Sequence, residues 1–91
     1  MNTPNEQYQY QQINATTQIK NAPGLIGGIF CSSVTGSPTL TVYDDVAGGT
    51  GTKIVDTFTL TAGTPFPFPA LFTKGLNMVI SGTASLTVFF N

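Results

Sequence analysis

The stretch VTGSPTLTVY at residues 34–43 decides the fold, because it returns 46 positions later as ISGTASLTVF at residues 80–89. The glycine, the leucine, one threonine and the valine are identical in the two copies, and most of the other pairs keep their character. Each copy predicts the end of one strand, a tight turn at its glycine, and a second strand of alternating residues. A hairpin that occurs twice predicts two sheets packed face to face.

Alternation assigns the two faces of the repeated strand. The residues on one face are expected in a common core, and they are Leu40, Val42, Leu86, Val88 and Phe90. The opposite face carries an aromatic ring flanked by threonine in each copy, Tyr43 in the first and Phe89 in the second. In a monomer these two rings would lie in water, so they are candidate interface residues.

Short strands with turns about every 8–12 residues are typical of β-sandwiches. No window has a helical period, so no helix is expected. The proline-rich segment at residues 65–69 predicts an edge strand or a crossing between sheets, because proline donates no ladder hydrogen bond. We therefore predict an all-β fold, a small antiparallel, jelly-roll-like β-sandwich at residues 13–91 after an extended N-terminal arm at residues 1–12. The strands are expected at 13–19 on one edge and at 25–34, 39–44, 54–60, 75–80 and 85–90.

The composition excludes several classes of protein. Charged residues make up only 8% of the chain, against about 25% in typical soluble domains. Three lysines without arginine cannot form a phosphate-binding stripe, so no nucleic acid partner is expected. No apolar run reaches the roughly 18 residues of a membrane span, and the N-terminal region has no apolar signal core. Such a charge-poor chain is either a polar, well-solvated protein or, as we favour, one that packs against copies or partners.

The N-terminal arm is rich in Asn, Gln and Tyr and has no hydrophobic period. Tyr8 and Tyr10 share one face if the arm is extended, so both are candidate anchors on a neighbouring chain. The alternative is that the arm folds over its own domain.

Candidate chemistry is scarce. The glycine-rich segment at residues 48–53 lacks the Gly-Lys-Ser/Thr of a phosphate loop and predicts a hairpin tip. Asp44, Asp45 and Asp56 could approach one another and bind calcium, although Asp44 capping a turn through its own backbone is the simpler interpretation. Cys31, the single cysteine, predicts a buried thiol. With no histidine and one glutamate, no catalytic pair can be assembled, so neither an enzyme nor a cofactor is expected.

Several turn and strand signatures together resemble small structural proteins of tailed bacteriophages. They are Ile19-Lys20, Ala22-Pro23-Gly24, Gly28-Ile29, Leu40-Thr41-Val42-Tyr43-Asp44, Thr61-Ala62-Gly63-Thr64-Pro65, Phe72, Gly75-Leu76 and Ser81-Gly82-Thr83-Ala84. The resemblance covers about residues 16–90 and transfers no functional site. It implies a capsid cement, or decoration, protein on the outside of the virion, assembled in the host cytoplasm.

The function expected from these observations is structural. A cement protein would form a homotrimer and clamp subunits of the major capsid protein, with Tyr8, Tyr10, Tyr43 and Phe89 as candidate interface residues. The alternative is a tail or fibre component that binds a receptor or a glycan. A third possibility is an assembly factor that is absent from mature particles.

Overall fold

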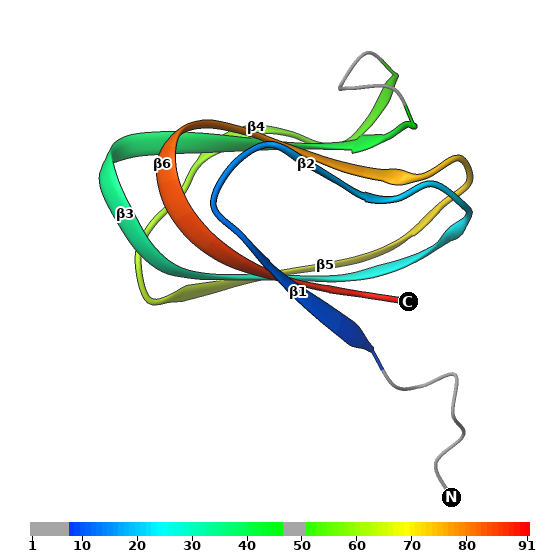
Figure 1. Ribbon diagram of the computed structural model, residues 1–91, viewed down its shortest axis with the longest axis horizontal. Helices are drawn as coiled ribbons and strands as arrows, with labels where there is room; N and C mark the ends of the chain where they lie inside the picture. The colour runs from blue at the N-terminus through cyan, green and yellow to red at the C-terminus, as the bar shows by residue number, and fades with distance from the viewer. Residues whose placement is uncertain (1–7, 47–50) are drawn as a thin grey trace, which may run out of the picture.

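The computed structural model describes residues 8–46 and 51–91, and within these residues it is built from strands without any helix (Figure 1). Figure 1 shows two layers, with the longest strands curving from one layer into the other. The six strands are β1 (Gln9–Ile13), β2 (Thr17–Lys20), β3 (Gly24–Asp44), β4 (Thr52–Thr59), β5 (Thr64–Phe72) and β6 (Leu76–Phe90). The predicted all-β, antiparallel fold is confirmed.

The two copies of the repeat lie at the bends of β3 and β6 and pair with each other. Val34 pairs with Ala84 and Leu40 pairs with Ile80, with an irregular register between Thr35 and Thr39. The expectation of two hairpins is therefore wrong, because each copy belongs to one continuous strand that bends at its glycine. A glycine with positive φ can produce either a turn or a bend, and here each strand bends and continues into the second layer.

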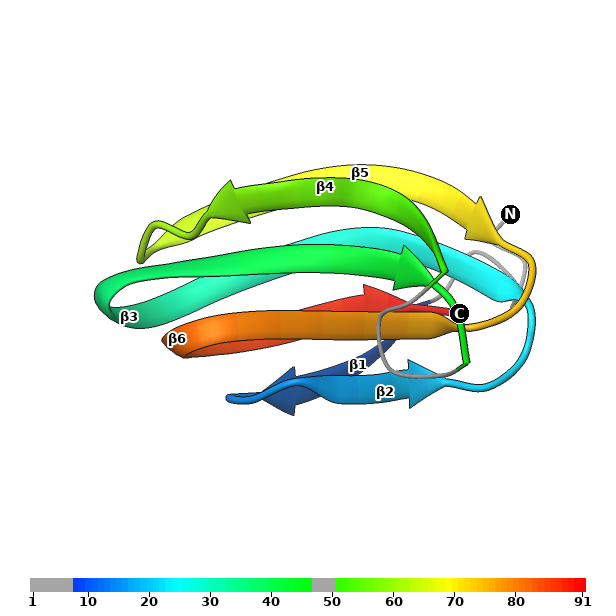
Figure 2. The ribbon, with the colours of Figure 1, turned by 90° about the horizontal axis from the view of Figure 1, so that it is seen from above.

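Each layer contains four strand segments. In one layer, β1 pairs with the second half of β6, which pairs with the first half of β3, which pairs with β5. In the other layer, β2 pairs with the first half of β6, which pairs with the second half of β3, which pairs with β4. Figure 2 shows β3 and β6 side by side at the centre, with the short strands outside them. This arrangement is that of a small jelly roll.

The start of the chain differs from the expectation. Residues 9–12, predicted to belong to the arm, lie in β1 and pair with β6, so the strand pairing begins at Gln9. A single edge strand at residues 13–19 is also wrong, because Ile13 pairs with Leu86 in one layer and Thr17 pairs with Met78 in the other. Residues 1–7, the rest of the predicted arm, lie outside the described residues.

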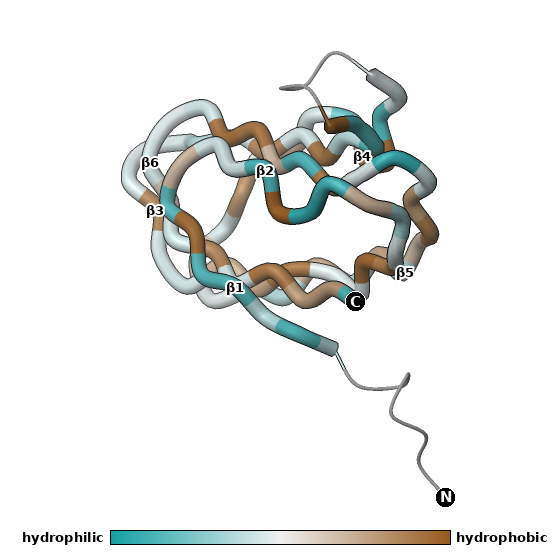
Figure 3. The backbone as a smooth tube through the Cα atoms, turned by 45° about the vertical axis from the view of Figure 1, so that its right-hand side comes forward, coloured by the Kyte–Doolittle hydropathy of each residue, from teal (hydrophilic) through white to brown (hydrophobic). Residues whose placement is uncertain are grey.

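The core lies between the layers and contains the residues that alternation assigned to it. Leu40, Val42, Leu86 and Val88 are almost completely buried and belong to one hydrophobic cluster, as predicted. Figure 3 shows hydrophobic segments in both layers. The other buried members of the cluster are Ile13, Ile26, Ile29, Cys31, Leu60, Phe72, Leu76, Met78, Ala84 and Phe90.

The proline–phenylalanine run forms most of edge strand β5, as its prolines required. Phe66 and Phe68 pack against the core, whereas the three prolines of the run are exposed. Phe58 of β4 meets both rings, with centroids 5.1 Å from Phe66 and 6.5 Å from Phe68. The strands β4 and β5 lie in different layers and do not pair through their backbones. These tilted and edge-on ring contacts join them.

Candidate interaction surface

One row of residues crosses all four strands of the β1–β6–β3–β5 layer on its outer side. Tyr10 pairs with Phe89, Phe89 pairs with Gly28, and Gly28 pairs with Pro67. The neighbouring residue Val88 is fully buried, so alternation directs Phe89 outward. Tyr10 is 73% exposed and Phe89 is 39% exposed.

A second row on the same side extends the apolar surface. Thr87 pairs with Phe30, and Phe30 pairs with Pro65. Phe30 is 38% exposed, although its chain neighbours Ile29 and Cys31 are buried in the core. The surface formed by Tyr8, Tyr10, Phe30, Pro65, Pro67 and Phe89 is called the aromatic face below.

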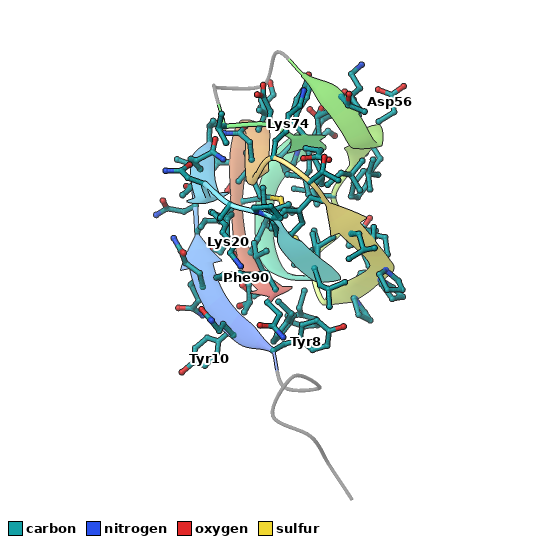
Figure 4. The ribbon with its side chains drawn as sticks, turned by 90° about the vertical axis from the view of Figure 1, so that its right-hand side faces the viewer. Tyr8, Tyr10, Lys20, Asp56, Lys74 and Phe90 are labelled. Atoms are coloured by element: carbon teal, nitrogen blue, oxygen red, sulfur yellow. The ribbon has the colours of Figure 1, made fainter. Side chains whose placement is uncertain are left out.

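A shallow groove of about 420 Å³ lies within the aromatic face. A Cβ atom on Gly27 would lie 3.1 Å from the ring of Tyr8, so this glycine leaves the space in which the ring packs. Gly28 has φ of 145°, and a Cβ there would lie 2.6 Å from the carbonyl oxygen of Phe66. Figure 4 shows Tyr8 and Tyr10 at the end of the molecule where β1 begins. The groove is lined by Tyr8, Gly27, Gly28, Ile29, Phe30, Pro65, Phe66, Pro67 and Phe89.

The aromatic face has no charged side chain. Its six residues, and all residues that line its groove, are apolar, aromatic or glycine. A contiguous apolar area of this kind on the outer side of a sheet is a typical sign of an interaction site. Aromatic rings are also the side chains most enriched at the centres of interfaces.

The structure brings together three of the four predicted interface residues. Tyr8 and Phe89 line one groove, and Tyr10 lies opposite Phe89. Tyr43 belongs to the other layer, where it pairs with Asn77 and with Lys53. The two copies of the repeat place their aromatic rings on different layers, so Tyr43 is not part of the aromatic face.

Asp44 caps a distant turn. Its carboxylate accepts hydrogen bonds from the backbone N–H groups of Thr73, Lys74 and Gly75, at 2.9, 2.8 and 3.3 Å, and from the Thr73 hydroxyl. The expected cap through its own backbone is therefore wrong. Partial desolvation raises the pKa of Asp44, but the hydrogen bonds outweigh it, so the pKa lies below its ordinary value near 3.8.

The described residues contain no group of three or more His, Cys, Asp or Glu side chains that could hold a metal ion. Asp44 is engaged at the turn, and Asp56 accepts a hydrogen bond from Lys53 at 3.1 Å. Cys31 is buried as predicted, and desolvation raises the pKa of its thiol. No helix in the described part of the chain is long and apolar enough to cross a membrane.

A partly buried polar network that the sequence did not reveal joins β2 to β6. The Gln18 amide donates to the carbonyl oxygens of Lys20, Asp45 and Leu76 at 2.9, 2.7 and 3.1 Å. Its oxygen accepts from the Asn77 amide at 2.6 Å. The Oδ1 atom of Asn77 is buried and has no hydrogen-bond partner among the described residues. The network holds the short strand β2 in place and exposes no reactive group.

A larger groove of about 620 Å³ lies at the end of the molecule near Lys20 and Asn91. Its walls come mainly from turns and strand ends, including Pro23 and Thr73. The aromatic face is the better candidate surface, because a sheet holds its residues in a fixed arrangement.

Comparison with known proteins leaves the family open. No protein-family model and no curated protein matches the chain. A solved structure of Bacillus endospore appendages, described as a novel family of disulfide-linked pili, contains a chain with 18% sequence identity and a TM-score of 0.46. The match covers 99% of this chain and 89% of the other. A likeness of this strength carries no information about function.

Proposed function

We propose that this protein is a structural subunit that works inside a large assembly and attaches to it through the aromatic face. The observation that carries the proposal is the position of Tyr10, Phe30 and Phe89 on the outer side of one sheet, without a charged side chain among them. A free monomer would leave this apolar area in water, whereas a partner of similar character would bury it.

The chemistry of the surface defines the partner. Because the aromatic face is uncharged, its partner is an apolar protein surface with few charges rather than an acidic or basic one. A stable contact buries roughly 800 Å² on each partner. The rings are the anchors in such a contact, and the flat prolines of β5 provide rigid area around them.

The resemblance to small tailed-phage proteins favours one form of this role, a cement protein on the capsid exterior. Its partners would be the major capsid protein and further copies of the same chain. This role needs binding surface and stability but no catalytic group, cofactor or metal.

The test is attachment to particles that lack the protein. Particles are produced from a genome that lacks the gene for this protein and are mixed with the purified protein. The bound fraction is then measured after sedimentation of the particles. Phe89→Ser should reduce binding by at least tenfold, because truncating an anchor residue costs about 2 kcal/mol or more. The matched control is Val46→Ser, which changes another exposed apolar residue outside the aromatic face.

Two results would contradict the proposal. The first is unchanged binding of Phe89→Ser, with its fold verified by circular dichroism. The second is equal loss of binding by Phe89→Ser and Val46→Ser, because a general loss of surface hydrophobicity would then account for the effect.

A further inference from the structure

The strands of the described residues leave four edges, and these edges differ in their ability to accept another strand. The outer strands are β1 and β5 in one layer and β2 and β4 in the other. An edge strand presents backbone N–H and C=O groups that can pair with another chain. Proteins block such edges with proline, charge, irregular register or short length.

Three of the four edges carry these obstacles. In β5, every second residue from Pro65 to Pro69 is a proline, which has no backbone N–H group. Every second residue of a strand directs its backbone groups to the same side. The three positions without an N–H group therefore lie on one side of the strand. That side is the open one, since the strand pairs with β3 on the other. The edge of β4 carries Lys53 and Asp56 and has two register shifts, and β2 has only four residues and ends at Lys20.

The edge formed by β1 is also short, but it has no proline, no charge and no irregular register. Its five residues contain no proline, glycine or charge, and the first four are exposed. No strand in the described part of the chain pairs with its outer side, because its partner β6 lies on the inner side. The row that contains Tyr10 continues directly onto the aromatic face through Phe89.

We propose that β1 pairs antiparallel with β1 of a second copy, so that the β1–β6–β3–β5 layers of two molecules join into one sheet. A two-fold contact places Gln11 opposite Gln11, or Tyr10 opposite Tyr10, and no like charges meet. In both registers each residue of β1 pairs with a residue an even number of positions away in the other copy. Side chains that point outward in one copy therefore pair with side chains that point outward in the other.

The contact has a consequence for attachment. A two-fold axis perpendicular to the sheet leaves both aromatic faces on the same side, so two faces are presented to the assembly together. The binding of the second face becomes intramolecular and therefore stronger. This inference goes beyond the proposed function, because it concerns the backbone edge of β1 and not the partner of the aromatic face.

The test is the mass of the isolated protein by sedimentation at micromolar concentration. The wild-type chain should sediment as a species of twice the 9.6 kDa of one chain. Gln11→Lys should sediment as a monomer, because in either register each copy then brings a lysine to the contact between the two edge strands. Thr59→Lys is the matched control, since it adds the same charge to an exposed position on the edge strand β4 and should leave the dimer intact.

A second measurement does not depend on the charge variant. In the register with Gln11 opposite Gln11, the variant Gln11→Cys should form a disulfide-linked dimer under oxidation, and in the register with Tyr10 opposite Tyr10 the variant Tyr10→Cys should do so. Thr59→Cys should form none, because its edge lies outside the contact. A wild-type monomer would overturn the β1 pairing, and so would a homotrimer, which a two-fold contact alone cannot build. Failure of the proposed function can be told apart from failure of the β1 pairing. A dimer that does not bind particles would support the pairing and contradict only the attachment through the aromatic face.

Discussion

Gly82 lies against Pro38 where the two long strands bend together, and a Cβ atom at position 82 would lie 3.0 Å from the Cα atom of Pro38. Gly36 occupies the equivalent place in the first copy of the repeat, but nothing lies within 4 Å of the position of its Cβ. Both glycines have positive φ, 72° for Gly36 and 100° for Gly82. The repeat is therefore symmetric in backbone conformation and asymmetric in packing.

This asymmetry predicts unequal effects of alanine. Gly36→Ala should lower the free energy of unfolding by about 1 kcal/mol, the strain of a left-handed backbone. Gly82→Ala adds a contact with a backbone atom and should lower it by roughly 1–3 kcal/mol more. Urea unfolding of the two variants provides the comparison, and equal midpoints would show that the bend adjusts freely around Pro38.

The two leucines of the repeat test the assignment of the hydrophobic core. Leu40→Ala and Leu86→Ala should each lower the free energy of unfolding by about 2–5 kcal/mol, because both side chains are almost fully buried in one cluster. Thr59→Ala, at an exposed position of β4, is the control and should change it by less than about 0.5 kcal/mol. A small shift in the urea midpoint of either leucine variant would contradict its place in the core.

The Asp44 cap predicts a pH dependence of stability. Its folded pKa lies below its ordinary value, so the carboxylate stabilises the fold fully above the unfolded pKa near 3.8. This contribution is lost as the pH falls through the lower folded pKa. Asp44→Asn should lower stability by about 1–3 kcal/mol at neutral pH.

The stability of the Asp44→Asn variant should also depend less on pH, between neutrality and pH about 3, than the stability of the wild type. Thermal unfolding at a series of pH values measures both effects. Parallel profiles of stability against pH for the two proteins would mean that the hydrogen bonds to Thr73, Lys74 and Gly75 do not lower the pKa of Asp44.

Truncations test the assignment of β1 to the sandwich. Deletion of residues 1–12 removes four of the five residues of β1 and their pairing with β6, so it should lower the urea midpoint clearly. Deletion of residues 1–7 keeps β1 whole and should have a smaller effect. Identical midpoints for the two truncations would show that residues 9–12 contribute nothing to the fold.

The fold class could be predicted because alternation along the repeat determines which residues are buried. Leu40 and Leu86 are in the core for this reason. The chain path could not be predicted in the same way, since a glycine with positive φ is compatible both with a hairpin turn and with a bend in a long strand. Only the pairing of Leu40 with Ile80, which is not local, distinguishes them.

The candidate surface could be predicted in part. Alternation placed Tyr8 and Tyr10 on one face of the arm and directed Phe89 away from the core. It could not show that Tyr43 lies on the other layer, because that depends on where β3 bends. Phe30 was missed, although its place between buried Ile29 and Cys31 is a signal for an outward ring. The side chains of the Gln18–Asn77 network come from separate strands and leave no pattern in the sequence.

The proposed role as a capsid cement protein makes this chain an abundant structural component of a virion. Quantitative mass spectrometry of virions purified from cells that carry its gene measures this directly, with the major capsid protein as the internal standard. A cement protein predicts hundreds of copies in each particle, in a fixed ratio to the capsid protein. A handful of copies would place the protein in a tail or fibre, and its absence from mature particles would contradict the claim.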